Sequence, residues 1–339
     1  MDLKPYSSAR DEFAGVQGVF LDANENPFPT EVNRYPDPHH LALKQKLAPL
    51  KGVKEEQILI GNGSDEVLDL LFRAVCEPGK DKVVTIKPSY GMYKVLANIN
   101  DVKIKEVPLT ISFDIDSDEI LKAAEDAKMI ILCSPNNPTG NSLNRDEIKS
   151  ILEKFDGLVV IDEAYIDFSS NPSLMSWLSE FENLFVCQTL SKAFGLAGIR
   201  VGIGLGSEEV VKLLNKIKPP YNVNSLSQKI ASKRLENILG VEEELIQIKL
   251  ERSRVEEYLS QNEFVKKLYP SDANFVLFKV DDANAFYTYF IERNVIVRNR
   301  TNVYGCENCL RVTIGTQEEN NRFIEVFESM INERRFSQL

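Results

Sequence analysis

The stretch LFVCQTLSKAFGLAGIRVGIGL, residues 184–205, sets a polar segment between two apolar runs. The runs LFVCQ and VGIGL are short and rich in apolar residues without polar alternation, which is typical of strands buried on both faces. The segment between them, TLSKAFGLAGIR, carries two hydroxyls, a lysine, two glycines and an arginine. Because the other groups suffice to bind a phosphate, the amine of Lys192 is left free for covalent chemistry.

A carboxylate stands in a similar place in LVVIDEAY, residues 158–165. Asp162 directly follows a buried run, where an acid is costly unless it is paired, and Tyr165 comes three residues later. The sequence leaves three partners open for Asp162: a protonated ring nitrogen, the amides of a helix N-terminus, or the cation of a structural ion pair. Since the ends of neighbouring parallel strands meet at one sheet edge, we expect Asp162 and Lys192 to converge. An amine, an acid and a phosphate site together indicate pyridoxal phosphate (PLP).

Seven short apolar runs recur along the first two thirds of the chain, separated by segments long enough for crossover helices. They begin at residues 57, 82, 102, 129, 158, 184 and 201. Helices are predicted in ILKAAEDA from residue 120 and in RDEIKSILEKF from residue 145. The pattern predicts an α/β fold with a mostly parallel, seven-stranded sheet flanked by helices.

The pattern changes after about residue 225. A long charged helix is expected over residues 240–260, followed by strands in NFVLFKV, VIVRN and CLRVTI and by a closing helix from Gln317. We therefore expect an N-terminal arm over 1–30, a large domain over 31–225 and a smaller α+β domain over 226–339.

Composition excludes several classes of protein. The chain has 339 residues, 43% of them hydrophobic, which is ordinary for a globular protein, and its net charge of -11 argues against nucleic acid as a partner. No secretory h-region and no apolar run of about 18 residues is present, so a cytoplasmic protein without a membrane segment is expected. Cys306 and Cys309 form a CxxC, but without a second CxxC we interpret them as incidental thiols and expect no metal.

Three further motifs offer site residues. GNGSDE places Ser64 and Asp65 at the start of a predicted helix, where they bind an anion or simply cap the helix. PSYGMY places Tyr90 after a strand, where its ring stacks on a planar cofactor or fills the core. SPNNPTG offers the amide of Asn137 to a phenolate or carboxylate, although Asn also suits turn geometry alone. Arg311, inside the apolar strand CLRVTI, is a structural ion-pair partner or a receptor for a carboxylate or phosphate.

These motifs together resemble the fold-type I PLP-dependent aminotransferases, and most closely the histidinol-phosphate aminotransferase family. The resemblance spans nearly the whole chain, and its motifs occur in a fixed order. The motifs are LDANENP (21–27), RYPDP (34–38), GNGSDE (61–66), PSYGMY (88–93), SPNNPTG (134–140), DEAYIDF (162–168), TLSKAFGLAGIR (189–200) and CLRVTIG (309–315).

The resemblance implies a role for each cofactor-binding position. Lys192 would form a Schiff base with PLP and act as general acid and base, and Asp162 would keep the ring nitrogen protonated. Asn137 and Tyr165 would hold the phenolic oxygen of the ring, on which Tyr90 stacks. The residues implied for the phosphate ester are Ser64, Asp65, Thr189, Ser191 and Arg200, with Tyr35 reaching it from the neighbouring subunit of a homodimer with shared active sites.

The resemblance also implies substrates. Arg311 would bind the α-carboxylate of glutamate, Arg298 and Tyr6 the phosphate of histidinol phosphate, and Asn24 would line the pocket. The implied reaction is reversible amino transfer between L-histidinol phosphate and 2-oxoglutarate in histidine biosynthesis. The alternatives are an aromatic amino acid aminotransferase of the same family and a non-catalytic PLP-binding regulatory module. A nicotinamide-dependent oxidoreductase is disfavoured because Glu66 stands where GxGxxG needs its third glycine.

Overall fold

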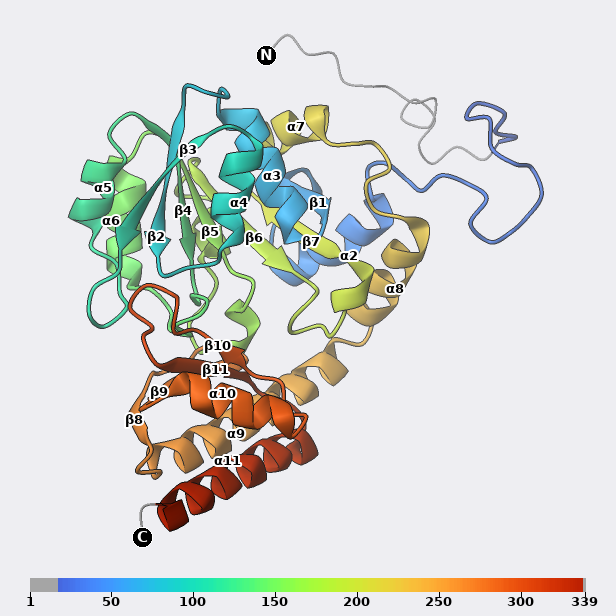
Figure 1. Ribbon diagram of the computed structural model, residues 1–339. Coiled ribbons are helices and arrows are strands. Elements are labelled where there is room, and N and C mark those ends of the chain that lie inside the picture. The colour runs from blue at the N-terminus through green and yellow to red at the C-terminus, as the bar shows by residue number, and fades with distance from the viewer. Residues whose placement is uncertain (1–17, 338–339) are drawn as a thin grey trace.

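The computed structural model describes residues 18–337, which form two lobes, each built on its own sheet (Figure 1). The large lobe has a seven-stranded sheet and the small lobe a four-stranded one. Helix α9 (Ile238–Ser260) joins them, because Val241 packs in the core of the large lobe and Val255 in that of the small lobe. The predicted α/β fold is confirmed.

The large sheet has the strand order β1-β7-β6-β5-β4-β2-β3. Its strands are β1 (Ile58–Asn62), β2 (Lys82–Lys87), β3 (Lys103–Pro108), β4 (Ala127–Cys133), β5 (Leu158–Asp162), β6 (Leu184–Thr189) and β7 (Val201–Leu205). All seven lie where the apolar runs predict them. Only β7 is antiparallel to its neighbours. Residues 190–200 join β6 to β7, and parallel pairing would need a longer crossover.

Helices cover both faces of the large sheet (Figure 1). One face packs against α3 (Ser64–Val75), α4 (Met92–Ile99) and α7 (Glu208–Ile217). The other packs against α2 (Leu41–Lys51), α5 (Ser117–Ala123), α6 (Arg145–Lys154) and α8 (Ser225–Leu235). Every residue of β6 and β7 is buried, which explains runs without polar alternation.

Helix α5 is shorter than its sequence predicts. It ends at Ala123, whereas the apolar periodicity suggests residue 127. Asp126 lies in the left-handed region at φ 61°, which stops the helix before β4 begins. Helix α6 matches its prediction because Asn144 caps it, accepting a hydrogen bond from the amide of Asp146 at 2.9 Å.

The small sheet has the order β10-β11-β9-β8. Its strands are β8 (Val265–Leu268), β9 (Phe275–Val280), β10 (Arg298–Asn299) and β11 (Cys309–Thr313). One face packs against α9, α10 (Ala283–Glu292) and α11 (Gln317–Ser337). The opposite face, which carries Phe275 and Leu277, belongs to the core of the large lobe. The small lobe therefore closes over one edge of the large sheet.

The prediction that VIVRN forms a strand is right only for its last two residues, Arg298 and Asn299. These two pair with β11, and residues 295–297 lie outside any strand. Strand β8 and helix α10 were not predicted. Strand β8 exposes two lysines and has little apolar signal, while the aromatic-rich α10 has the composition of a strand.

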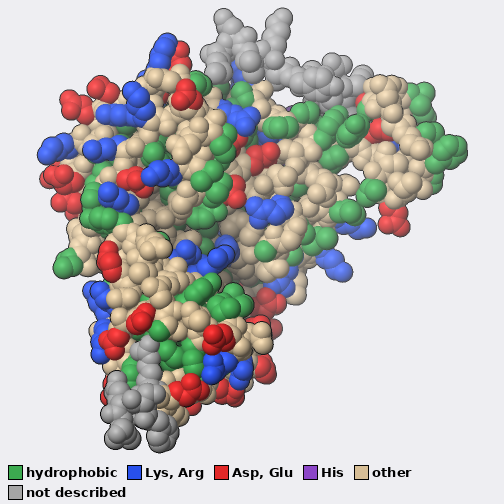
Figure 2. Space-filling model, viewed as in Figure 1, with side chains coloured by type: hydrophobic (Ala, Val, Ile, Leu, Met, Phe, Trp, Pro, Cys, Tyr) green, Lys and Arg blue, Asp and Glu red, His purple; other side chains and the backbone are tan. Residues whose placement is uncertain are grey.

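Charge is mixed over the surface. Figure 2 shows acidic and basic side chains interspersed on the face it draws, with Lys and Arg in the hollow between the lobes. Among residues 18–337, no helix has the length and apolar composition needed to cross a membrane. The same residues hold no cluster of three or more His, Cys, Asp or Glu side chains suited to a metal ion.

Close packing between β7 and the start of α3 generates a stability prediction. A Cβ added at Gly202 would lie 2.3 Å from backbone atoms of Gly63 and Ser64. We expect Gly202→Ala to lower the free energy of unfolding by about 1–3 kcal/mol, because neither backbone can move without repacking. A Cβ at Gly198 meets nothing within 4 Å, so Gly198→Ala is the matched control. Urea unfolding of both variants tests this, and equal midpoints would contradict it.

Candidate active site

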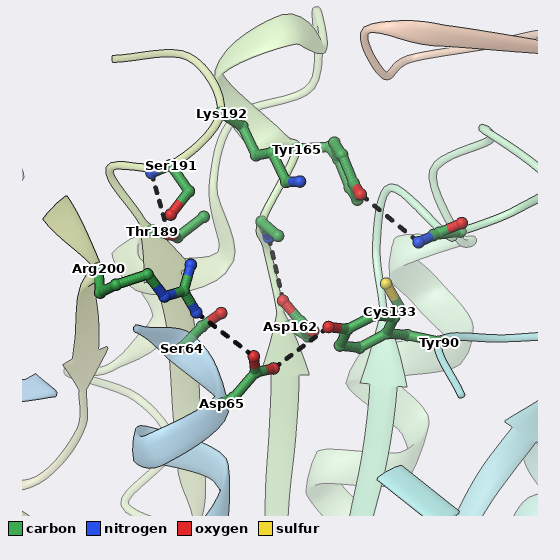
Figure 3. A pocket seen from close by; sticks show the side chains of 12 residues that line it. Ser64, Asp65, Tyr90, Cys133, Asp162, Tyr165, Thr189, Ser191, Lys192 and Arg200 are labelled. Carbon is green, nitrogen blue, oxygen red and sulfur yellow. Dashed lines mark hydrogen bonds and ion pairs between the residues drawn. The ribbon is translucent and has the colours of Figure 1, made fainter. Parts of the chain in front are cut away.

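A pocket opens at the carboxyl ends of β5 and β6, where Asp162 ends one strand and Lys192 follows the other by three residues (Figure 3). The expected convergence of these two side chains is therefore seen. Ten predicted site residues line this one pocket together with Cys133 and Ala164. The ten are Ser64, Asp65, Tyr90, Asn137, Asp162, Tyr165, Thr189, Ser191, Lys192 and Arg200.

Asp162 is a buried carboxylate with hydrogen bonds but no cation. Its side chain is 3% exposed. The hydroxyl of Tyr93 donates to Oδ2 at 2.7 Å, and the amide of Ala164 donates to Oδ1 at 3.1 Å. Among the described residues no basic side chain forms a salt bridge with it. Burial raises the pKa of Asp162 to about 6, although both hydrogen bonds oppose the rise. A protonated ring nitrogen would supply the missing positive charge.

Sequence reasoning missed Tyr93, although the residue belongs to the PSYGMY motif. Tyr93 lies in the first turn of α4, three residues after Tyr90, which precedes the helix, and Tyr93 is 1% exposed. The rings of the two tyrosines meet edge to face, with centroids 5.6 Å apart. The second tyrosine of the motif, three residues after Tyr90, is the signal that could have found it.

The surroundings of Lys192 favour nucleophilic chemistry by its amine. Its Nζ lies 5.6 Å from the centre of the Tyr165 ring, and Figure 3 shows the side chain pointing into the pocket above Asp162. Burial, Arg311 and Arg200 lower the pKa of the Lys192 amine, while Asp162 opposes this effect. A lowered pKa increases the fraction of neutral amine, which is the nucleophilic form.

The opposite end of the pocket forms an anion cradle. Helix α3 begins at Ser64, and its N-cap Gly63 supplies no side-chain cap, so the first amides of the helix are left for a ligand. The Oγ atom of Ser191 is buried and has no hydrogen-bond partner. Nη2 of Arg200 lies 3.6 Å from Oδ2 of Asp65, and a Cβ at Gly63 would meet that Nη2 at 2.6 Å. These donors fit a phosphate ester.

Between the cradle and Lys192, polar and aromatic groups border the space that a planar ring would occupy. The Tyr90 hydroxyl donates to Oδ1 of Asp65 at 3.2 Å, which fixes the tyrosine at the wall. Nδ2 of Asn137 donates to the Tyr165 hydroxyl at 3.5 Å. A guanidinium nitrogen of Arg311 donates to Oδ1 of Asn137, so the small lobe reaches the pocket. The donor set therefore fits PLP as predicted.

Four predicted site residues lie elsewhere or are not described. Tyr35 is 48% exposed, and its ring stacks on Tyr221 with centroids 4.5 Å apart. Asn24 lines a separate cleft between residues 23–36 and the start of α8. Arg298 is exposed on β10, directly opposite Arg311. Tyr6 falls outside the described residues. Within one chain Tyr35, Asn24 and Arg298 do not line the pocket of Figure 3.

Cys306 and Cys309 are fully buried beside the small sheet. Burial raises the pKa of the Cys306 thiol to about 12 and that of Cys309 to about 11, so both thiols are protonated at neutral pH. Neither cysteine lines the pocket.

The raised pKa of Asp162 predicts how the stability of the cofactor-free protein depends on pH. An acid with a pKa of about 3.9 unfolded and about 6 folded favours the folded state below pH 4, and this contribution is lost as the pH rises to about 6. The free energy of unfolding of Asp162→Asn minus that of the unaltered protein should therefore be larger at neutral pH than at pH 4, by about 2–3 kcal/mol. Urea unfolding across this range measures the difference. A difference that stays constant with pH would refute the assignment.

Comparisons with known proteins agree with this geometry. The chain is 55% identical over 334 residues to a histidinol-phosphate aminotransferase of Christiangramia forsetii, covering 98% of this chain and 95% of the relative. It is 53% identical over 330 residues to one of Parabacteroides distasonis, covering 97% and 96%. The crystal structure of the histidinol-phosphate aminotransferase from Clostridium acetobutylicum superposes with a TM-score of 0.83 at 26% identity, covering 89% of this chain and 92% of that one.

The sequence pattern of a protein family matches most of the chain. The family is described as aminotransferase class I and II, and the match extends over residues 22–327, which include both lobes and every residue of the pocket. With a match of this length and relatives of this identity, the chain belongs to the class I and II aminotransferases.

Proposed function

We propose that this chain is a PLP-dependent histidinol-phosphate aminotransferase. The reaction is reversible amino transfer between L-histidinol phosphate and 2-oxoglutarate, as a step of histidine biosynthesis. The observation that carries the proposal is the single pocket that combines an amine of lowered pKa, a buried carboxylate without a cation and an anion cradle. Relatives at 49–55% identity, all named histidinol-phosphate aminotransferases, support the substrate.

Each wall of the pocket has a proposed part in holding the cofactor. The α3 amides, Thr189, Ser191 and Arg200 would bind the phosphate ester. Asp162 would face the ring nitrogen, Asn137 and Tyr165 the phenolic oxygen, and Tyr90 the ring. When bound, PLP supplies an electron sink for the pair of electrons left as a proton departs from the substrate.

Lys192 is proposed to anchor the cofactor covalently and then to move the proton. Because burial and two arginines lower its pKa, the amine accepts a proton and returns it more readily at neutral pH than an exposed lysine would. A cation facing Asp162 would lower the cost of its buried negative charge, so the carboxylate and the ring nitrogen would favour each other's charged forms. Arg311 and Arg298, with Tyr6 and Asn24, are proposed to bind substrate.

We further propose that the protein is a cytoplasmic homodimer with shared active sites. Tyr35 lies outside the pocket of its own chain and would reach the phosphate in the partner subunit. Exposed apolar side chains gather on residues 19–35 and on the adjacent helix α8, which suits a covered interface. They are Val19, Leu21, Phe28, Val32, Leu226 and Ile230.

The division into an arm (1–30), a large domain (31–225) and a small domain (226–339) also remains a proposal. Its support is that the large sheet ends with β7 at Leu205, whereas the small sheet begins with β8 at Val265.

Subunit mixing tests the shared site. Tyr35→Ala should weaken the cofactor phosphate site of the partner, and Lys192→Ala should lower turnover about 1,000-fold or more by removing the covalent anchor. A mixed dimer has one site with both Lys192 and the partner's Tyr35. Exchanging subunits between the two variants should therefore restore activity that neither has alone. A mixture no more active than the average of its parents would count against sharing.

Substrate comparison tests the proposed specificity. The purified protein, loaded with PLP, should transfer the amino group of histidinol phosphate at least about tenfold more efficiently than that of phenylalanine. Steady-state kcat/KM for the two donors, with 2-oxoglutarate as acceptor, measures this ratio. Equal values would favour the aromatic aminotransferase. Full transaminase activity in Lys192→Ala would remove Lys192 from the mechanism. A PLP-loaded unaltered protein without transaminase activity on either donor would favour the non-catalytic alternative.

A further inference from the structure

Three arginines share the face of the small sheet that is turned toward the large lobe. In the antiparallel pair β10–β11, Arg298 lies opposite Arg311, and Arg300 lies two residues farther along the same side. Arg311 in turn lies opposite Leu277 on β9. Leu277 and Phe275 belong to the same core cluster as Tyr165, which lines the pocket. The three guanidinium groups therefore project from the side of the sheet that closes the pocket.

The backbone holds Arg300 in place. Its amide donates to the carbonyl of Cys309 at 2.8 Å, which continues the β10–β11 ladder by one residue, and its carbonyl accepts from the amide of Val303 at 2.8 Å. The side chain is partly buried, and its Nε atom is buried without a hydrogen-bond partner. The same is true of Nε in Arg311. A buried donor without an acceptor is costly, so an acceptor belongs here.

No carboxylate of residues 18–337 forms an ion pair with Arg298, Arg300 or Arg311. Burial, Arg300 and Arg298 lower the pKa of Arg311 to about 10, and burial and Arg298 lower that of Arg300. The other titratable groups that act on Arg300 are Tyr165 and Cys306, which are neutral at neutral pH. The cluster is therefore a cationic site that lacks its anion.

We propose that Arg300 is a specificity-determining residue that binds the second negative charge of a phosphate monoester substrate. This inference rests on the proposed function. Histidinol phosphate carries its phosphate on the carbon that corresponds to the α-carboxyl carbon of glutamate, so one site must accept both anions. A phosphate monoester bears about -1.5 to -2 charges at pH 7, against -1 for a carboxylate. One arginine fork satisfies a carboxylate, and a further guanidinium favours the phosphate.

The experiment measures kcat/KM of the PLP-loaded enzyme for histidinol phosphate and for glutamate in Arg300→Gln, Arg300→Lys and the control Arg322→Gln. Arg322 is an exposed residue of α11 that pairs with Glu325. In Arg300→Gln we expect kcat/KM for histidinol phosphate to fall about 10- to 100-fold through KM, and that for glutamate to change only about threefold or less. Arg300→Lys keeps the positive charge but lacks the planar guanidinium. Its kcat/KM for histidinol phosphate should therefore lie between that of Arg300→Gln and that of the unaltered enzyme. The control should match the unaltered enzyme.

A pH series and a binding measurement separate substrate binding from a structural role. Since the second phosphate proton leaves near pH 6, the preference of the unaltered enzyme for histidinol phosphate over glutamate should rise through that pH, and Arg300→Gln should flatten the rise. Inorganic phosphate should raise the thermal midpoint of the PLP-loaded enzyme, whose cofactor cradle is already filled. Arg300→Gln should abolish much of this shift, whereas a purely structural role would leave it unchanged.

The outcomes keep this inference apart from the proposed function. An Arg300→Gln enzyme that keeps both the substrate preference and the phosphate-induced shift overturns the role of Arg300. An equal loss for both substrates also overturns it. If the unaltered enzyme ignores histidinol phosphate, but phosphate stabilises it and Arg300→Gln abolishes that effect, the substrate proposal fails and the anion site stands. If Arg300→Gln does not fold, the same readings on Arg300→Lys decide.

Discussion

The structure depends on a carboxylate held in the apolar interior without a cation of its own. Asp162 ends a strand in the middle of the seven-stranded sheet, with the Tyr93 hydroxyl and the Ala164 amide as its hydrogen-bond donors. Burial makes the charged form costly, and the hydrogen bonds from neutral donors offset only part of that cost. Such an arrangement favours a ligand that brings a positive charge, such as a protonated ring nitrogen, and the surrounding side chains border a space that fits a planar ring.

The order of the strands in the sheet places the other reactive side chains near Asp162. Strand β6 runs parallel to β5 at the next position, so its end delivers Thr189, Ser191 and Lys192 to the same edge. Arg200 directly precedes the antiparallel strand β7, and its guanidinium lies at the start of α3. An anion site and an amine therefore flank the carboxylate because of strand order alone.

The small lobe contributes positive charge from the other side. Arg311 reaches Asn137 across the junction between the lobes, and the residue opposite it on β10, Arg298, is also an arginine. Arg311 lowers the pKa of Lys192, and Arg300 and Arg298 lower the pKa of Arg311. Because Arg311 is also proposed to bind the anionic substrate, anion binding and the pKa of Lys192 would be coupled.

Much of the fold follows from local sequence. Buried strands read as short apolar runs, and the polar residues after them predicted the convergence of Asp162 and Lys192. The contact between Tyr93 and Asp162 joins residues 69 positions apart, and only the packing of α4 on the sheet reveals it. The side on which Arg300 points depends on the register of a two-residue strand. The proposed role of Tyr35 involves a second subunit, so the sequence and structure of one chain do not reveal it.

The most direct test of this account is the protonation state of the ring nitrogen in bound PLP, measured by nuclear magnetic resonance with that nitrogen isotopically labelled. We predict a protonated nitrogen at neutral and mildly alkaline pH in the unaltered protein, and an unprotonated one in Asp162→Asn. An unprotonated nitrogen in the unaltered protein would mean that the buried carboxylate does not serve the cofactor, and it would contradict the account.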